Sequence, residues 1–289
     1  MTGRTYRFHC NSCKVGMQKV GHFVRKSDGR RVQRFRCPAC KLGRSDGSDH
    51  PCYRQNKRHL NLTVRGLLAS SVSQRRIALV LGISRLTVAR KFEFLANQAA
   101  LNHEKFLKNF TDKPIREIFL DEMEDRVHTK CKPVAIALIV TKDRKILNTH
   151  VSRIRPKNRN LYVISKKKYP AWTNNSREGF RTLLKQTVSF LSSDVTIRSD
   201  QKQMYRDEIE KILPGSTHKR YKSRRAVIAG HGELKEGGRD PLFELNHTCA
   251  MLRANINRLV RRTWSTSKKA ESLFKHIQIY ADFHNTVLT

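Results

Sequence analysis

The chain has 289 residues with 59 Lys and Arg against 24 Asp and Glu, giving a formal net charge of +35 and an isoelectric point near 10.6. So large a positive charge indicates a polyanionic partner, with nucleic acid ahead of a membrane surface. No apolar run is long enough to span a bilayer, and no apolar core follows the first basic residues, so we expect a soluble protein that is neither exported nor bound to membranes.

Two Cys-x-x-Cys pairs near the start of the chain predict a metal site. Each such turn can aim two thiolates at one side of a tetrahedron, so two turns predict a closed structural Zn²⁺ site. The four ligands are Cys10, Cys13, Cys37 and Cys40. The segment between the pairs alternates in character around Ser-Asp-Gly at 27–29, which predicts a β-hairpin. We therefore expect a zinc ribbon over residues 1–56.

The remaining cysteines carry weaker signals. Seven cysteines, an odd number, in a chain without an export signal argue against a disulfide framework. Cys52 with His50 stays open as an alternative pair of ligands. Cys131 and Cys249 are expected to be ordinary thiols.

Residues 57–98 predict a helix-turn-helix DNA-binding domain. Ser73 is the expected N-cap of the first helix, Gly82 ends it and Ser84 caps the second. The apolar positions that would pack the two helices and their turn are Ile77, Ala78, Leu81, Ile83, Leu86, Val88 and Phe92. The side chains expected to face a DNA major groove are Arg85, Thr87, Arg90 and Lys91. An ordinary pair of antiparallel helices in a bundle is the alternative.

A linker helix is expected over residues 99–114, followed by an α/β domain over 115–289. The predicted strands are 116–121, 133–141, 145–153 and 195–199, and the predicted helices are 176–192, 202–213 and a long one over 241–264. Three strands in a meander, followed by alternating helix and strand, are typical of a ribonuclease-H-like α/β fold.

In such a sheet Asp121, at the end of the first strand, and Asp200, at the end of the fourth, would lie side by side. Two converging carboxylates repel each other unless a cation lies between them. A pair of hard divalent cations, Mg²⁺ or Mn²⁺, would fit this position and support phosphoryl transfer. Glu244, near the start of the long helix, is the candidate for a third acid.

Other interpretations of these acids stay open. Glu124 and Asp125 fit a solvated cluster that balances neighbouring Lys and Arg. Glu122 fits either a role behind Asp121 or an exposed position. Asp200 by itself would also fit a helix N-cap, because its side-chain oxygen can satisfy free amides of the following turn.

Three stretches resemble the insertion-sequence-one family of bacterial DDE transposases, over essentially the whole chain: FLDEMEDRV, VTIRSDQKQMY and NINRLVRRTWSTSKKAESLFKHIQIYADFHN. The resemblance implies that Asp121, Asp200 and Glu244 are catalytic magnesium ligands and that the protein cleaves and joins DNA strands. The segment between residues 213 and 243 is longer than the family pattern. It leaves three competitors for the third acid, which are Asp240, Glu236 and Glu233.

The sequence thus predicts an insertion-sequence transposase that works at the bacterial nucleoid in the cytoplasm, as a homo-oligomer assembled on DNA. The ribbon and helix-turn-helix would bind terminal inverted repeats, and the α/β domain would cut. Basic side chains expected to follow phosphates are Arg253, Arg258, Arg261, Arg262, Lys268 and Lys269. A DNA-binding regulator without catalysis and a site-specific nuclease are the alternatives.

Overall fold

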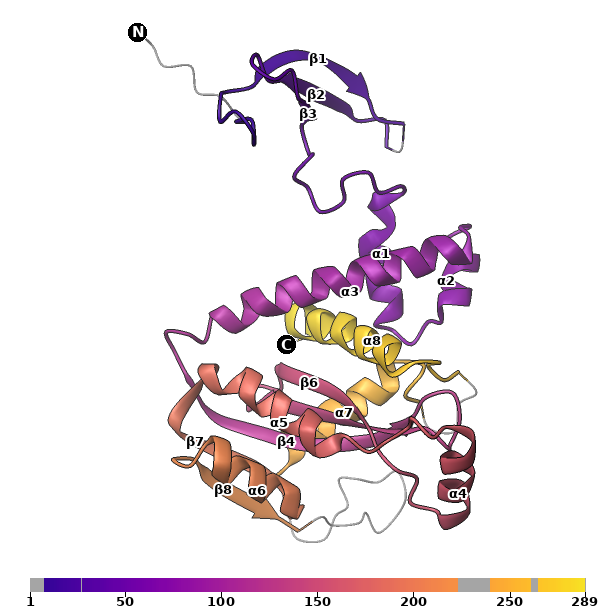
Figure 1. The fold of residues 1–289 in the computed structure, drawn as a ribbon, viewed down its shortest axis with the longest axis vertical. Helices are drawn as coiled ribbons and strands as arrows, with labels where there is room; N and C mark the ends of the chain where they lie inside the picture. The colour runs from indigo at the N-terminus through magenta and orange to yellow at the C-terminus, as the bar shows by residue number, and fades with distance from the viewer. Residues whose placement is uncertain (1–7, 27, 223–239, 261–264, 289) are drawn as a thin grey trace. The chain divides into compact units, whose positions relative to one another are not determined.

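The computed structural model describes residues 8–26, 28–222, 240–260 and 265–288. The chain divides into two compact units, Met1–Thr63 and Val64–Thr289. Figure 1 shows the elements of both units along the chain. Within the described residues, no helix combines the length and apolarity needed to cross a bilayer.

The first unit contains a three-stranded antiparallel sheet in the order β1-β2-β3. Its strands are β1 (Gln18–Val24), β2 (Arg31–Arg36) and β3 (Gly43–Ser45). The predicted hairpin is confirmed, since the Arg25 amide donates to the Arg30 carbonyl at 2.9 Å. Gly29 in its turn has φ +66°, a left-handed conformation that glycine adopts without steric cost.

The predicted helix caps are confirmed. A short 3-10 turn, η1 (Arg58–Leu60), leads into α1 (Asn61–Leu68), α2 (Gln74–Val80) and α3 (Arg85–Lys108). The Ser73 and Ser84 hydroxyls accept from backbone amides in the first turns of α2 and α3, at 3.3 and 3.1 Å. Gly82, at φ +59°, ends α2 with amide bonds from residues 82 and 83 back to the carbonyls of Leu79 and Ala78.

Two predictions about the face of α3 are wrong. Leu86 is 59% exposed, whereas Lys91 is only 2% exposed. The reason is the 100° advance per helical residue, which places Leu86 200° away from the fully buried Val88. Lys91 lies three residues after Val88 and so shares its buried side. Lys91 therefore cannot project toward a DNA groove.

Helix α3 is continuous where the sequence predicted a separate linker helix. Its 24 residues pack against α8 (Ala270–Phe283), and the two helices lie side by side in Figure 1. The carboxylate of Asp282 on α8 accepts from Arg65 of α1 at 3.0 Å and from Asn102 of α3 at 3.1 Å. The helical segment and the sheet that follows thus belong to one compact unit.

The second unit is built on a mixed five-stranded sheet with the order β6-β5-β4-β7-β8. Strands β4, β5 and β6 pair antiparallel, and β7 and β8 run parallel to β4. The strands are β4 (Ile115–Arg126), β5 (Pro133–Thr141), β6 (Ile146–Arg153), β7 (Leu191–Asp200) and β8 (Thr217–Tyr221). The prediction of an α/β domain is confirmed.

Helices cover both faces of this sheet. α7 (Phe243–Asn255) and α8 pack on one face, while α5 (Ser176–Thr187), η2 (Val188–Phe190) and α6 (Gln203–Ile212) pack on the other. β5 shows the consequence, since Ile136 and Leu138 enter one core and Ala137 and Ile139 enter the other. A strand buried on both faces reads as a continuous apolar run, as this one does.

Several element bounds differ from the prediction. β4 runs on to Arg126, five residues beyond the expected end, because β5 pairs with it along its whole second half. The long helix predicted over 241–264 is wrong, since α7 ends at Asn255 and Ile256 has extended backbone angles. The elements that were not predicted include β3, α1, β8, α8 and α4 (Arg159–Lys168).

The end of the chain, η4 (His284–Leu288), is tied to the turn between β5 and β6. The Asn285 side chain accepts from the Ile146 amide at 2.8 Å and donates to its carbonyl at 2.9 Å. A ring nitrogen of His284 bonds the Arg144 carbonyl at 2.9 Å. His284 and Asn285 therefore have a structural role in this fold.

Candidate active site and metal centre

Asp121 and Asp200 come to the same edge of the sheet. β4 and β7 are neighbouring parallel strands in which Phe119 pairs with Arg198. Each aspartate lies two residues further along its own strand, so the register places them next to each other. The negative charge of Asp200 is one cause of a raised pKa at Asp121.

The Asp121 carboxyl has a pKa raised from its usual 3.8 to about 6, first by burial and then by the charge of Asp200. Two donors hold one of its oxygens in place and oppose the shift. They are the Glu122 amide at 2.6 Å and the Tyr205 hydroxyl at 3.1 Å. A cation between two such half-buried carboxylates would relieve their mutual repulsion.

Glu122 is buried beside this pair, which excludes the exposed position considered from the sequence. Its side chain is 3% exposed, and one carboxylate oxygen accepts from the Lys202 ammonium group. The other oxygen is buried without a hydrogen-bond partner in the structure. Burial raises the pKa of Glu122, and that of Tyr205 is raised by burial and then by the charges of Asp121, Glu122 and Asp200. Of these three carboxylates, Asp121 accepts a hydrogen bond from the Tyr205 hydroxyl.

Glu244 lies beside residues of β4 that precede Asp121. It occupies the first turn of α7, is 9% exposed, and lines a pocket of about 350 Å³ together with Glu117, Phe119 and Arg198. Glu117 and Phe119 precede Asp121 by four and two residues, so all three side chains leave the same face of β4. In the described part of the chain, the carboxylate oxygens of Asp121, Asp200 and Glu244 do not lie close enough together to form a group of three potential metal ligands.

The competitors for the third acid separate clearly. Asp240 accepts from the Leu242 amide at 3.0 Å and from the Asn246 side chain at 2.7 Å, which fixes the start of α7. That role is structural and uses both of its oxygens. Glu233 and Glu236 lie outside the described residues.

The structure also places the remaining acidic residues considered from the sequence, which are Glu124, Asp125 and Asp200. Glu124 pairs with Lys157 at 2.8 Å, and its side chain is 47% exposed, as expected for a solvated charge. Asp125 is half-buried, and burial raises its pKa. Asp200 accepts from the Lys202 amide at 3.0 Å, but the N-cap of α6 is Lys202 itself. Asp200 thus supports the turn before α6 without serving as its N-cap.

A stability measurement tests the carboxylate pair without any assay of activity. The folded-state pKa of Asp121 lies above its unfolded value, so its charge destabilises the fold increasingly as pH rises from about 4 to 6. Asp121→Asn should therefore stabilise the metal-free second unit at pH 7 by about 1–3 kcal/mol, and by almost nothing below pH 4. Denaturant unfolding at both pH values measures this difference.

The response to magnesium is the second half of that measurement. Mg²⁺ should stabilise the wild type at pH 7 and should leave Asp121→Asn unchanged, because a ligand stabilises only the state that binds it. An Asn variant that is less stable than the wild type at pH 7, and still responds to Mg²⁺, would contradict the assignment of the pair.

The four predicted cysteines come together in the first unit. The sulfur atoms of Cys10, Cys13, Cys37 and Cys40 all lie within 4.8 Å of one another, so they could hold a metal ion such as zinc. They form the one such group of three or more potential ligands in the described chain. Phe35 and Met17 pack against the cluster and exclude water from one side.

Both cysteine pairs adopt the same local structure. The amides of Lys14 and Lys41 donate to the carbonyls of Cys10 and Cys37 at 2.9 and 3.1 Å, and both lysines have positive φ. Backbone bonding, first from Cys13, lowers the pKa of Cys10 to about 6. A side-chain hydrogen bond with Cys40, followed by burial, raises the pKa of Cys13 to about 12. Such a set of thiols is poised for a cation that would let all four ionise.

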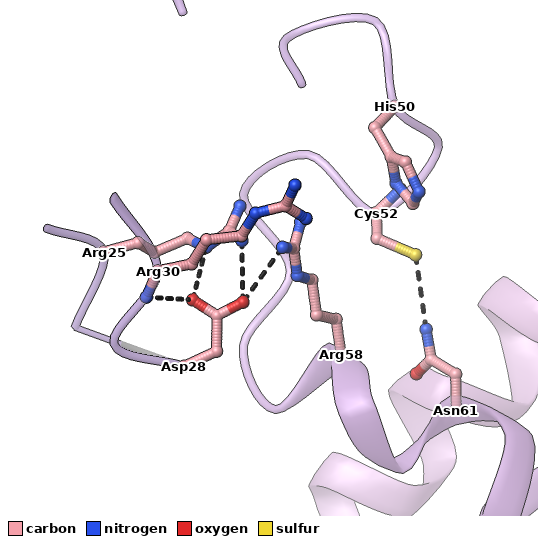
Figure 2. A network of polar contacts seen from close by, with 7 residues as sticks. All are labelled: Arg25, Asp28, Arg30, His50, Cys52, Arg58 and Asn61. Atoms are coloured by element: carbon pink, nitrogen blue, oxygen red, sulfur yellow. Dashed lines mark hydrogen bonds and ion pairs between the residues drawn. The ribbon is translucent and has the colours of Figure 1, made fainter. Parts of the chain in front are cut away.

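His50 and Cys52 do not join this cluster. The Cys52 amide donates to His50 Nδ1 at 3.0 Å, and the Cys52 sulfur accepts from Asn61 at 3.4 Å. Figure 2 shows both residues in this polar network, beside the ion pairs of Asp28. Cys131 and Cys249 are buried free thiols, as expected, and burial raises the pKa of Cys249 to about 12.

The predicted DNA-binding side chains divide by exposure. Arg85, Arg90, Lys268 and Lys269 are exposed, and the Thr87 hydroxyl bonds the Ser84 hydroxyl at 2.9 Å. Arg258 is half-buried and donates to the Thr266 carbonyl at 3.3 Å. Arg253 is half-buried, and its charge acts on Asp125. Arg261 and Arg262 lie outside the described residues.

Sequence reasoning did not single out Tyr205 and Lys202 as members of the acidic site, and it left Glu122 open between a role behind Asp121 and an exposed position. The position of Tyr205 could have been inferred in part, because it follows Asp200 by five residues and lies in the first turn of the predicted helix, close to the expected acidic site. Comparison with known proteins does not extend these assignments, since no family model and no curated protein matches the chain.

Proposed function

We propose that this protein is a DNA transposase whose second unit cleaves and joins DNA strands. The observation that carries the proposal is the half-buried pair of Asp121 and Asp200 at neighbouring positions of two parallel strands, with the pKa of Asp121 raised to about 6. The hydrogen bonds that the structure shows to this pair come from a phenol and backbone amides: Asp121 accepts from Tyr205 and the Glu122 amide, and Asp200 accepts from the Lys202 amide. The arrangement suits a hard divalent cation.

The sheet order supports a ribonuclease-H-like fold for this unit. Three antiparallel strands are followed by two parallel ones that add on the side of the first strand, with helices on both faces. That order makes the first and fourth strands parallel neighbours, so Asp121, within the first strand, lies beside Asp200, at the end of the fourth.

Within this proposal the chain's own residues have distinct tasks. Asp121 and Asp200 would hold Mg²⁺ or Mn²⁺, and Glu244 would complete the set from α7. The bound ions would supply activation of the attacking oxygen and stabilisation of the leaving one. The Tyr205 hydroxyl fixes the orientation of the Asp121 carboxylate, and Lys202 balances the charge of the buried Glu122. The four cysteines would hold a structural zinc in the first unit.

The direct test uses duplex DNA from both sides of the coding region. Purified protein should nick this DNA when Mg²⁺ is present, should not nick it when Mg²⁺ is omitted, and should join a pre-cleaved end to a target plasmid. Binding without nicking would favour a DNA-binding regulator, and nicking without joining would favour a nuclease.

Recognition is tested separately at the start of α3. Arg85→Ala or Arg90→Ala should weaken binding to the element ends by roughly 1–3 kcal/mol if the side chain reads a base. If it contacts a phosphate instead, the slope of the logarithm of affinity against the logarithm of salt concentration should fall by the amount expected for about one phosphate contact. Gel-shift titrations at several salt concentrations distinguish the two cases.

The matched control is Lys105→Ala, because Lys105 is an exposed basic residue at the opposite end of the same helix. Its affinity for the element ends should stay close to that of the wild type. Unchanged affinity and unchanged salt dependence for both arginine variants would leave α2 and α3 as an ordinary pair of packed helices.

A further inference from the structure

A pocket in the first unit is lined by residues of its three strands and of the segment that follows them. Phe35 packs against the cysteine cluster, so its neighbours Arg34 and Arg36 on β2 leave the opposite face. They line a groove of about 820 Å³ between the sheet and the segment that follows it. Eight of its lining residues are Lys or Arg, and one, Asp46, is acidic.

An ion-pair network builds one wall of this groove. Asp28 at the tip of the hairpin binds Arg25 at 2.6 Å and Arg58 at 2.9 Å, and it also accepts from the Arg30 amide at 3.3 Å. Figure 2 shows these residues converging on the one carboxylate. The network ties Arg58 to the hairpin, and both Arg25 and Arg58 line the groove.

Other basic side chains of the groove are available for a ligand. Lys26 and Arg34 line it, and in the described residues their side chains have neither an ion pair nor a hydrogen bond. Their charges are therefore not neutralised within the unit. Two free cations on a shared groove fit successive phosphates of a nucleic-acid backbone.

Aromatic side chains lie in the same groove. Phe23 is 41% exposed and Tyr53 is 47% exposed, although both are large enough to be buried in a core. The Arg54 guanidinium lies over the Tyr53 ring at 5.4 Å. Flat rings beside free cations are the combination that binds unpaired nucleotides, because each base can stack while its phosphate is neutralised.

We propose that this groove binds a single-stranded segment of DNA, with bases stacked on Phe23 and Tyr53 and phosphates on Lys26 and Arg34. A duplex would use only the cations, because its base faces are covered by their neighbours. The inference deepens the proposed function, since cleaving and joining strands at element ends exposes unpaired nucleotides. It assigns the first unit to that strand and leaves duplex recognition to α3.

The first experiment locates the contact in the unaltered, zinc-loaded full chain without added Mg²⁺. A single-stranded oligothymidine carrying 5-iodouracil is bound and irradiated, and the crosslinked peptides are identified by mass spectrometry. Crosslinks should fall on Phe23 or Tyr53. Crosslinks that fall only on the second unit would overturn the proposal.

The second experiment measures affinity for fluorescein-labelled oligothymidine at several salt concentrations. The double variant Phe23→Leu, Tyr53→Leu should bind roughly 5- to 100-fold more weakly, and the loss should persist at high salt because stacking is not ionic. The double variant Lys26→Gln, Arg34→Gln should instead reduce the salt dependence by about one to two phosphate contacts. Zinc content should remain at the wild-type level in both.

Matched controls come from exposed residues outside the groove. Lys19→Gln changes a lysine on β1 that is paired with Phe35 and absent from the lining, and Tyr162→Leu changes an exposed aromatic on α4. Both should bind like the wild type. Unchanged affinity in the Phe23, Tyr53 double variant, or equal loss of duplex and single-strand binding, would overturn the assignment. Metal-dependent nicking is scored separately, so this failure is distinguishable from failure of the transposase proposal.

Discussion

Asp121→Asn and Asp200→Asn should each abolish metal-dependent DNA nicking while DNA binding persists or tightens. Asparagine keeps the shape of the side chain but removes the charge that a divalent cation requires. The loss should exceed the roughly 10- to 100-fold that follows removal of a hydrogen-bond partner behind a metal ligand. Binding should tighten because a negative charge near the DNA phosphates has gone. Nicking of labelled DNA, in Mg²⁺ and in Mn²⁺, beside a gel shift on the same proteins measures both effects.

Glu124→Gln is the matched control, since Glu124 lies on the same strand but is half-exposed and paired with Lys157. It should nick like the wild type. Normal nicking by both aspartate variants would end the DDE proposal altogether. If Glu244→Gln alone nicks normally, the aspartate pair stands, and the third acid must be sought at Glu122 or among Asp240, Glu236 and Glu233.

Cys37→Ser should release about one zinc ion per chain and unfold the first unit. The apolar cluster around the cysteines contains few residues besides them, so metal binding must supply most of the folding free energy of this unit. Structural zinc in small domains contributes an apparent 10–16 kcal/mol at neutral pH, about as much as a whole domain's stability. The second unit has its own two cores and should keep its fold.

Zinc analysis by mass spectrometry and limited proteolysis of the two units provide the measurement. Cys52→Ser is the control, because Cys52 lies close in sequence but accepts a hydrogen bond from Asn61 outside the cluster. It should retain zinc and resist proteolysis. Wild-type protein with an intact first unit and no bound metal would contradict the zinc assignment.

Local signals in the sequence predicted local structure well. The caps at Ser73 and Ser84 and the helix end at Gly82 depend on a few neighbouring residues, and all three are present as expected. The gathering of four cysteines also followed from short-range spacing, because each pair is a single turn. The approach of Asp121 and Asp200 followed from strand order, which the alternation of elements indicated.

Features that depend on tertiary packing were missed. α4 buries only Ser165 and β8 buries none of its residues, so neither carries an apolar pattern of its own. α8 did carry one, since Leu273, Ile277 and Tyr280 recur at helical spacing. The sequence could not decide between the two positions considered for Glu122, because its burial depends on residues distant in the chain, such as Lys202.

In the proposed function, the unbroken course of α3 would fix the distance between the DNA-recognition residues and the catalytic carboxylates. Its first turn carries the exposed Arg85, while Leu107 near its other end is packed in the same core as Leu120, the residue before Asp121. Twenty-four residues at 1.5 Å each set an offset of about 36 Å. A continuous helix keeps the distance between its two ends constant. The number of base pairs between the recognised sequence and the cleaved bond would then depend on the length of this one helix. Removing a single residue from it would rotate the recognition residues by about 100° relative to the catalytic carboxylates.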